Sequence, residues 1–441
     1  MAAYGRRNIK PVSLKPKTIF LADIAILNLT SSRLPQQDIT QIQKSIQYKY
    51  PLGNDRLRQQ IQMALNKSVG GSHLGRPAYR KLVNIKAPRP LLSMMKFVIY
   101  NNWQQLPESA HARFAQGEKV NLFFSRPWLE NVAATLDDAE ALLLACVISD
   151  GNVLAILPLI MGHGNTCYSL KHRYTSHYSL LLADDDQQRI LTCLAQGLSQ
   201  WPIHSLLLEP IADNDSRLTG LHQALATAGY HGERHFRHYN WIYRLQQQSY
   251  VDYLASRPAR LRNTIVRKKR KLHRDHGYKI RLFSGDEVPL AMSDYYLVYN
   301  ASWKANEQYV DFLDGVVAGF SQQGWSRLAV LYVCGQPVAA QLWFVLHGKA
   351  SIFRLAYDEA WKQYSPGSIL TSFLMEYVID TDKVDEIDFL TGNDAYKQDW
   401  MSERRECFAL SCVKNVKTAN RHQRFIELLK SKILRKTIKR L

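Results

Sequence analysis

Between residues 327 and 400 the apolar positions change from a strand-like period to a helix-like one. β-branched and aromatic residues dominate the runs Leu328 to Val333 and Val338 to Leu346, and the turn residues Cys334 to Pro337 between them predict a hairpin. A third run, Ala350 to Ala356, follows. Apolar residues then recur at helical spacing until strand character returns at Glu386 to Leu390. The pattern predicts three strands, a loop, a helix and a further strand.

The loop before this helix contains Tyr364 and the sequence Ser365, Pro366, Gly367 and Ser368. The first turn of a helix presents backbone N–H groups without partners and the positive end of the helix dipole. Proline has no N–H to leave unpaired there, and glycine lets a ligand approach the backbone. We therefore predict that Ser365 to Ser368 bind a phosphate or pyrophosphate. An ordinary capped helix start is the alternative.

A similar alternation occurs earlier in the chain. The apolar stretch Leu142 to Met161 is interrupted by turn residues around Gly151, which predicts two strands of a hairpin and not a membrane span. This hairpin matches the one around Gly335 at a nearly constant offset, as the strand Ile203 to Leu208 matches Val384 to Phe389. The approach to Trp128 likewise matches the approach to Trp303. These offsets favour duplication over two unrelated α/β units.

Seven pieces, in this order, resemble a known family. They are Leu261-Arg262-Asn263-Thr264 with the basic run to Leu272, Ser302-Trp303-Lys304, Gly335 to Ala340, Ala356-Tyr357-Asp358, Tyr364 to Gly367, Asp388 to Gly392, and Tyr396-Lys397 followed by Trp400. Together they resemble the GNAT-superfamily acyltransferases of the CelD type, named for cellulose-biosynthesis accessory proteins and related to the FemABX peptidyltransferases. The loop before Gly367 departs from the more glycine-rich pyrophosphate loop of other GNAT enzymes.

The resemblance implies an α/β (α+β) fold of tandem GNAT-like domains, each a mixed, mostly antiparallel sheet flanked by helices. We predict an N-terminal extension of unknown role over residues 1–107 and a first, degenerate domain over 108–248. A second domain with the acyl-CoA site should cover 249–413, followed by a basic amphipathic tail over 414–441. Acyl-CoA, with acetyl-CoA as the first choice, is the implied co-substrate, and no metal is expected.

The two halves differ at the phosphate loop. The first half offers the segment from His172 to Tyr178, which contains no glycine. Because bulky side chains would keep a pyrophosphate away from the backbone, we expect the cofactor site in the second half. The first half then forms a wall of the acceptor cleft. Its His-rich loop either contacts the acceptor or is ordinary surface.

Composition and charge narrow the class of protein. With 441 residues and 46% hydrophobic content, the chain is long enough for two or three domains. Its six cysteines have no zinc-ligand spacing and no signal peptide opens the sequence, which favours a cytoplasmic protein. The net charge of +19 is concentrated in residues 257–281 and 414–441. The tail is either a helix that binds the anionic inner face of a membrane or a helix packed on its own domain.

Direct acyl transfer needs an acid, a base and donors to the acyl oxygen, but no nucleophile triad. The resemblance implies that a tyrosine protonates the leaving thiolate and that a backbone N–H near Phe353 to Leu355 meets the acyl oxygen. We predict Tyr396 as the acid. The candidate carboxylates are Asp358, Asp388 and Asp394. Turn formation is the alternative for Asp358, and pairing with a buried cation is the alternative for Asp388.

Four further residues are expected on the acceptor side: Trp303, Lys304, Lys397 and Trp400. Aromatic faces suit sugar rings, and Lys397 could hold an anionic group. Packing and the rim are the alternative roles.

The leading hypothesis is an acyl-CoA-dependent N- or O-acyltransferase that acts on a sugar or lipid-linked saccharide of the cell surface. A FemABX-like aminoacyl transferase, with residues 257–274 on tRNA, is a second hypothesis. The third is a non-catalytic basic scaffold for membrane or nucleic acid. The sequence lacks the interleaved aromatic and basic spacing that we expect of a single-strand reader, so nucleic acid is the least favoured partner.

Overall fold

The structure, a computed structural model, describes residues 95–137, 140–304 and 306–415. The predicted N-terminal extension therefore lies mostly outside the described residues, as does the tail after Asn415. No helix in the described ranges is both long enough and apolar enough to cross a membrane.

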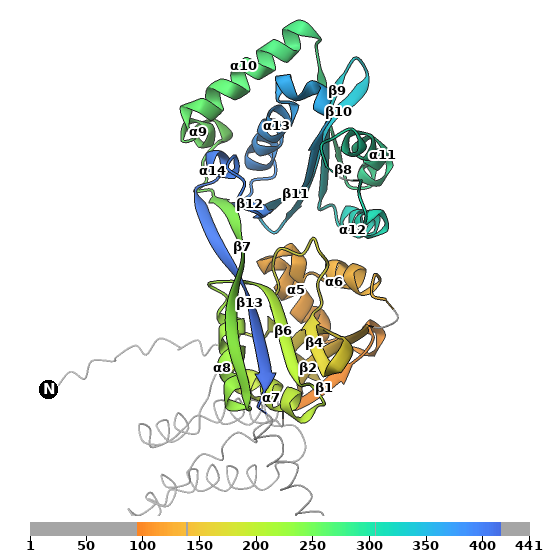
Figure 1. The fold of residues 1–441 in the computed structure, drawn as a ribbon, viewed down its shortest axis with the longest axis vertical. Helices are drawn as coiled ribbons and strands as arrows, with labels where there is room; N and C mark the ends of the chain where they lie inside the picture. Colours follow the sequence, from red (N-terminus) through yellow and green to blue (C-terminus); the bar gives the residue numbers. More distant parts are fainter. Residues whose placement is uncertain (1–94, 138–139, 305, 416–441) are drawn as a thin grey trace, which may run out of the picture. The chain divides into compact units, whose positions relative to one another are not determined.

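The described elements form two series with the same order of strands and helices (Figure 1). The first series is β1 (Lys96–Tyr100), α5 (Ala110–Val120), α6 (Arg126–Ala133), β2 (Ala141–Ser149), β3 (Asn152–Met161), β4 (Thr166–Ser169), α7 (Gln187–Gln200), β6 (Ser205–Ala212), α8 (Ser216–Thr227) and β7 (Tyr230–Arg244). The second series is β8 (Lys279–Ser284), α11 (Glu287–Asn300), α12 (Val310–Gln322), β9 (Ser326–Val333), β10 (Gln336–Leu346), β11 (Lys349–Tyr357), α13 (Pro366–Asp380), β12 (Glu386–Thr391), α14 (Lys397–Trp400) and β13 (Glu403–Lys414).

Helices α9 (Tyr250–Ala255) and α10 (Ala259–Asp275) connect the two series. Shorter elements are η1 (Trp103–Gln105), η2 (Leu122–Phe124), η3 (His163–Asn165), η4 (Glu359–Tyr364) and the two-residue strand β5 (Leu181–Leu182). The predicted fold class is confirmed: the chain has a mixed, mostly antiparallel sheet flanked by helices. However, β1 lies inside the range 1–107 and pairs with β2, so the sheet begins before the predicted boundary at residue 108.

The sheet runs in the order β1-β2-β3-β4-β6-β13-β7-β12-β11-β10-β9-β8, with β5 beside β3. If each strand in this order is replaced by its counterpart in the other series, the result is the same order written from the opposite end. Each series therefore contributes its last strand to the other one. Strand β13 lies between β6 and β7, and β7 pairs with both β13 and β12.

Both predicted hairpins are present, and each has a turn of two residues with positive φ. Strands β9 and β10 are joined through Cys334 and Gly335, and β2 and β3 through Asp150 and Gly151, all with positive φ. The proposed match of Trp128 with Trp303 is not reproduced. Trp128 is fully buried on α6, whereas Trp303 is 51% exposed in the loop before α12.

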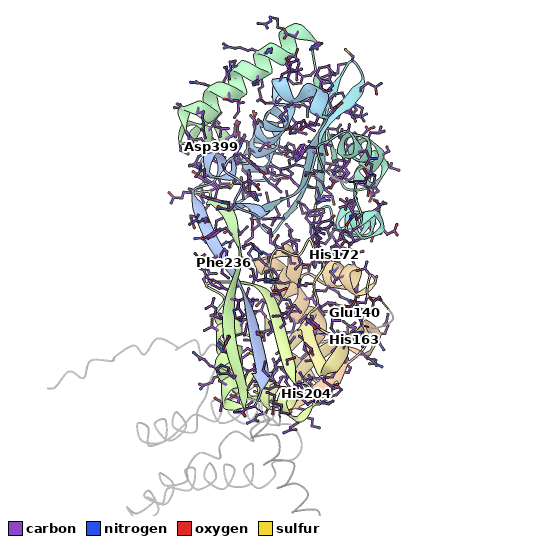
Figure 2. All side chains as sticks on the ribbon, in the orientation of Figure 1. Glu140, His163, His172, His204, Phe236 and Asp399 are labelled. Carbon is purple, nitrogen blue, oxygen red and sulfur yellow. The ribbon has the colours of Figure 1, made fainter. Side chains whose placement is uncertain are left out.

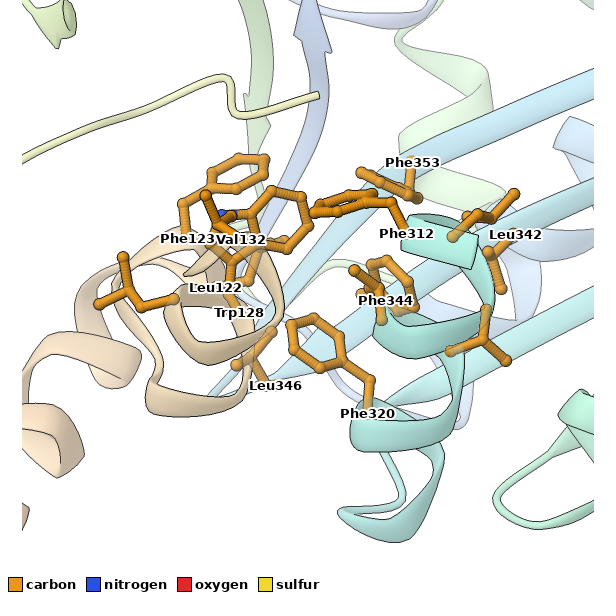
Figure 3. Close-up of a cluster of buried hydrophobic side chains, with 14 of the residues drawn as sticks. Leu122, Phe123, Trp128, Val132, Phe312, Phe320, Leu342, Phe344, Leu346 and Phe353 are labelled. Carbon is orange, nitrogen blue, oxygen red and sulfur yellow. The ribbon is translucent and has the colours of Figure 1, made fainter. Parts of the chain in front are cut away.

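One hydrophobic core joins both series (Figure 3). The Trp128 ring lies edge-on to Phe312 of α12 at 5.4 Å and to Phe353 of β11 at 5.8 Å between centroids. Asn131 Nδ2 donates to the Phe312 carbonyl over 2.9 Å. Two further cores lie under α7 and α8 and under α10 and α13.

Helix α10 has a narrow apolar stripe. Leu261, Ile265 and Leu272 are buried in the same core as α13. The sequence showed the concentration of basic residues in this segment but not which of its few apolar side chains would be buried. The stripe attaches α10 to the second series and leaves Arg262, Arg267, Arg270 and Arg274 exposed, whereas Lys269 turns inward and donates to the Ser372 hydroxyl over 3.0 Å.

Candidate functional site

The site is built on two strands that separate. The parallel strands β11 and β12 pair only from Lys349 with Glu386 to Ser351 with Asp388. Beyond that point they diverge, and a cavity of about 560 Å³ opens between them. The cavity is lined by Ile352, Phe353, Arg354, Leu355 and Tyr357 of β11 and by Phe389, Leu390 and Thr391 of β12. Predicted residues Phe353 and Leu355 thus lie on its wall.

Separated strands leave backbone carbonyl groups without partners, which is costly in a closed site. Two lysines meet this need. Lys304 donates to the Leu355 carbonyl over 2.5 Å, and Lys397 donates to the carbonyls of Phe389 and Thr391 over 2.9 and 2.7 Å. Both side chains line the cavity. Lys397, which was predicted to hold an anionic group, thus uses two of its three ammonium hydrogens at the end of β12.

Burial lowers the pKa of both lysines. For Lys304 burial, followed by repulsion from Arg354, brings the pKa to about 8. For Lys397 burial also lowers the pKa, while Asp394 and Asp388 oppose the change. Lys304 therefore changes charge close to neutral pH, since a lysine in water titrates near 10.4.

The start of α13 faces the same cavity. Gly367 and Ser368 line it, as do Gln341 of β10 and Thr371. Gln341 is buried and donates from Nε2 to the Gly367 carbonyl over 2.9 Å, which fixes the first turn of the helix. A Cβ atom at Gly367 would lie 3.3 Å from the Tyr357 ring. A side chain here would fill the space between the helix start and β11.

Ser365 and Pro366, the other two residues of the predicted phosphate loop, connect η4 to α13. Ser365 has a φ of 52° and links η4 to α13, and its side chain makes no capping hydrogen bond. Pro366 is buried at the first position of α13. Neither lines the cavity, so the part of the loop that faces the cavity is Gly367 and Ser368.

Tyr396 and Asp394, two of the four predicted catalytic residues, line the cavity. The Tyr396 side chain is 44% exposed. Partial burial and the neighbouring Asp394 raise its pKa, so the hydroxyl is protonated at neutral pH. Asp394 Oδ2 lies 3.9 Å from Lys397 Nζ, and its side chain is mostly exposed. An acid and a carboxylate thus share one wall.

Asp358 and Asp388 lie elsewhere. Asp358 accepts a hydrogen bond from the Ala360 N–H over 2.9 Å and caps η4. Its alternative role as a turn residue is the one that the structure shows. Asp388 is buried and does not line the cavity.

Asp388 belongs to a buried polar cluster. Its carboxylate accepts hydrogen bonds from Asn240 Nδ2 at 2.5 Å, Arg405 Nη2 at 3.0 Å and the Leu390 N–H at 2.6 Å. Burial works to raise its pKa, but the nearby His177 imidazole, Arg405 and Asn240 together lower the pKa to about 2. The carboxylate is paired with a cation, which was the alternative to catalysis.

The first series contributes one wall of the cavity. Arg173, Tyr174 and Ser176 from the His-rich loop line it, in agreement with the expectation that this half contacts the site. The neighbouring His172 stacks on Phe312 with ring centroids 3.6 Å apart. Burial, followed by repulsion from Arg354, lowers the pKa of His172 to about 4.

Sequence reasoning missed Arg354. Its guanidinium pairs with Glu307, donates to the Tyr174 hydroxyl over 3.0 Å and lies 4.2 Å from the Tyr174 ring centroid. The sequence does contain a signal for it, because Arg354 is the one charged residue in the apolar run Ala350 to Ala356. Arg354 ties β11 to the loop of the first series beside the cavity.

Aromatic rings close the remaining side. The Trp303 and Tyr357 rings lie 4.6 Å apart and both line the cavity, together with Trp400, which is almost fully buried. The Trp400 carbonyl accepts a hydrogen bond from the Tyr253 hydroxyl over 2.8 Å. All four residues predicted for the acceptor side therefore lie on the wall of the cavity. No group of three or more metal-binding side chains suited to an ion is present in the described ranges.

Comparison with known proteins adds the family of this site. Residues 259–398 match the model of the family described as acetyltransferase (GNAT) domain. No curated protein is significantly similar to the chain.

Among solved structures the chain is similar to FemX, with 10% identity, a TM-score of 0.48 and coverage of 70% of this chain and 96% of that one. It is also similar to a tandem GNAT protein from the clavulanic acid biosynthesis pathway, with 12% identity, a TM-score of 0.42 and coverage of 72% and 98%. A third similar structure is L-PGS from Bacillus licheniformis, with 11% identity, a TM-score of 0.43 and coverage of 73% and 96%.

The family match extends over β11, α13 and β12. The cavity lies where β11 and β12 separate. The match includes the predicted residues from Trp303 to Lys397. The CelD-type relationship within the superfamily stays a prediction. The residues that match the acetyltransferase (GNAT) domain model supply most of the cavity wall.

Proposed function

We propose that the protein transfers an acyl group from acyl-CoA to an amine or hydroxyl group bound in this cavity, with acetyl-CoA as the first donor to test. The observation that carries the proposal is the separation of β11 and β12 opposite the start of α13. A thioester lying between the strands would reach the Leu355 backbone while its pyrophosphate met the helix start.

The donor side fits an anionic ligand. Gly367 offers a first-turn N–H with no side chain in front of it, and Ser368 adds a hydroxyl group. In a strand, the N–H and C=O of one residue point to the same side. Since the Leu355 carbonyl accepts from Lys304 in the cavity, the Leu355 N–H also points there and can donate to the acyl oxygen.

The chemistry uses two groups on the opposite wall. Asp394 takes the proton of the attacking amine or hydroxyl, the new bond to the acyl carbon forms and the carbon–sulfur bond breaks. The thiolate leaves with the proton of Tyr396, whose raised pKa keeps it protonated until then. Lys304 holds β11 in place and adds positive charge beside the acyl oxygen.

The side chains that line the cavity indicate which class of acceptor it would bind. The Trp303 and Tyr357 rings offer apolar faces, while Arg173 and Ser176 offer polar groups. This combination suits a sugar ring, which has both apolar faces and hydroxyl groups. A saccharide, free or linked to lipid, is therefore the acceptor that we propose.

One observation favours a second candidate, in which the donor is aminoacyl-tRNA. Helix α10 packs beside α13 and η4, next to the donor loop, and its exposed cations include Arg267, Arg270 and Arg274. The partly exposed Lys271 lines the same surface. These residues form an open surface on one helix that would suit RNA phosphates.

Thermal unfolding with candidate donors tests both. A ligand at about a hundred times its dissociation constant adds about 2.7 kcal/mol of stability. We expect acetyl-CoA to raise the midpoint of the native protein but not that of Gly367→Trp. Stabilisation by aminoacyl-tRNA alone, lost on removal of Arg267 and Arg270, would favour the second candidate. No response to any acyl-CoA or charged tRNA would contradict acyl transfer.

A further inference from the structure

Strands β7 and β13 carry a continuous stack of aromatic and arginine side chains. The Arg404 guanidinium lies 4.0 Å from the Tyr239 ring centroid, and the Tyr239 ring lies 4.8 Å from Phe236. Phe236 is 6.1 Å from Phe408, and Arg234 lies 4.5 Å from the Phe408 ring. Trp241 extends the stack beyond Arg404, at 5.8 Å. We call these six residues the β7–β13 stack.

The stack is accessible. Phe236 is 49% exposed, and Arg234 and Arg404 are both exposed. Figure 2 shows Phe236 beside the crossing of β7 and β13, between α8 and Asp399 of α14. At about 3.3 Å per residue, the positions from Arg234 to Trp241 span roughly 20 Å, enough for several units of an extended chain.

The guanidinium groups of Arg234 and Arg404 are available to bind anions. Each guanidinium is held against an aromatic ring, and neither pairs with a carboxylate of the described residues. A stacked guanidinium keeps its N–H donors free in its own plane and loses less freedom on binding than a mobile side chain. Glu406, opposite Tyr239, adds one carboxylate to this region, so the surface suits spaced charges better than a dense polyanion.

One end of the stack reaches the cavity. Trp241 Nε1 donates to Asn393 Oδ1 over 3.0 Å, and the Gly392 N–H donates to the Tyr239 carbonyl over 2.9 Å. Thr391 and Asp394, which flank Gly392 and Asn393 in the chain, line the cavity. A chain lying along the stack is thus led to the wall that carries Asp394.

We propose that the β7–β13 stack is a docking surface for an anionic oligosaccharide, one end of which enters the cavity as the acyl acceptor. The aromatic rings contact the apolar faces of sugar rings, and Arg234 and Arg404 bind carboxylate or phosphate groups carried by the chain. This inference rests on the proposed function for the role of the cavity. The docking itself is a binding event that needs no donor.

Binding of fluorescently labelled oligogalacturonate, which carries a carboxylate on every ring, tests the proposal by fluorescence anisotropy at low salt without acyl-CoA. We expect binding that weakens as salt is raised. The double variant Arg234→Ala/Arg404→Ala should bind at least about tenfold more weakly, a change of about 1.4 kcal/mol. Replacing both arginines by lysine should restore only part of the affinity, because lysine keeps the charge but not the planar stack.

The chain offers a matched control on β8. Arg281 is also an exposed arginine stacked on an aromatic ring, 4.6 Å from Phe283, and Lys279 is exposed on the same strand. The variant Lys279→Ala/Arg281→Ala removes the same charge and should retain binding. Equal losses in both double variants would reduce the effect to general attraction by a basic protein and overturn the proposal.

Two further probes decide the class of ligand. A neutral malto-oligosaccharide of similar length should bind more weakly than oligogalacturonate. Tighter binding of single-stranded oligothymidylate would assign the stack to nucleic acid and overturn the saccharide proposal. Because these measurements omit the donor, their failure leaves the acyl-CoA tests unaffected, and failure of those tests leaves the docking result standing.

Discussion

Lys304 donates a hydrogen bond to the Leu355 carbonyl in the part of β11 that is no longer paired with β12. This contact joins the loop after α11 to a strand that lines the cavity. It also places a titrating ammonium group, with a pKa of about 8, on the cavity wall. The charge state of this one side chain should therefore appear in the pH dependence of the reaction.

The first prediction is a falling limb in kcat/KM near pH 8. Above that pH the Lys304 ammonium loses its proton, and with it the positive charge beside the acyl oxygen. Lys304→Arg should remove the limb, since arginine stays charged throughout. Lys349→Arg is the matched control, because Lys349 also donates to a carbonyl, that of Val120, outside the cavity. A profile that rises through pH 8 would instead make neutral Lys304 the base.

The second prediction concerns the start of α13. Gly367→Trp should abolish binding of acetyl-CoA in calorimetry, because the indole would fill the space beside Tyr357. The thermal midpoint without ligand should change little. Ser365→Gly serves as the control, since it relieves a positive φ and removes a side chain that makes no capping bond. Unchanged affinity in Gly367→Trp would remove the helix start from the donor site.

The third prediction concerns the acid. If Tyr396 protonates the leaving thiolate, Tyr396→Phe should lower kcat by about a hundredfold with little change in donor affinity. Tyr168→Phe, on the surface of β4, should leave both unchanged. Normal turnover in Tyr396→Phe would transfer the role to Tyr357, which also lines the cavity, or to water.

Local sequence patterns predicted the hairpins and α13, because each depends on residues close together in the chain. The fold class came from the family resemblance. Together they pointed to most of the cavity wall. They did not reveal the exchange of β7 and β13, which depends on pairing between distant segments. The β7–β13 stack was missed for the same reason. Arg234 and Phe236 alternate on one strand, but their partners Phe408 and Arg404 lie on another. Whether the chain binds single-stranded nucleic acid, which the spacing of its aromatic and basic residues disfavours, stays a prediction.

The fourth prediction tests the buried cluster around Asp388. Its folded pKa of about 2 is below the unfolded value of about 3.9. A lowered carboxylate pKa stabilises the protein above the unfolded pKa, and this contribution is lost as pH falls from about 4 to about 2. Arg405→Met, which leaves the buried carboxylate without its cation, should cost about 3 to 5 kcal/mol at neutral pH in urea unfolding.

The double variant Asp388→Asn/Arg405→Met should be more stable than Arg405→Met alone, since no buried charge remains unpaired. Arg244→Ala is a suitable control, because Arg244 pairs with Glu386 and Glu403 at an exposed position. Its loss should cost about 1 kcal/mol or less. If Arg405→Met behaved like Arg244→Ala, the pairing with Asp388 would contribute little to the fold.

The last prediction follows from the exchanged strands. Two independent domains usually unfold in two steps. Here β13, from the second series, lies between β6 and β7 of the first, and Trp128 packs against Phe312 and Phe353. Neither series completes its half of the sheet without a strand from the other. We therefore expect the described part of the chain to unfold in a single transition. All nine tryptophans lie in it, four in the first series and five in the second, so fluorescence follows both.

A substitution on β13 should destabilise both series together. Leu410 is buried in the core under α7 and α8 although it belongs to the second series. Leu410→Ala should cost about 2 to 5 kcal/mol and shift the whole fluorescence transition while its shape stays unchanged. The exposed Val413→Ala on the same strand is the control and should change stability by about 0.5 kcal/mol or less. A second transition, separated from the first in Leu410→Ala, would show that each series can fold without the strand that the other supplies.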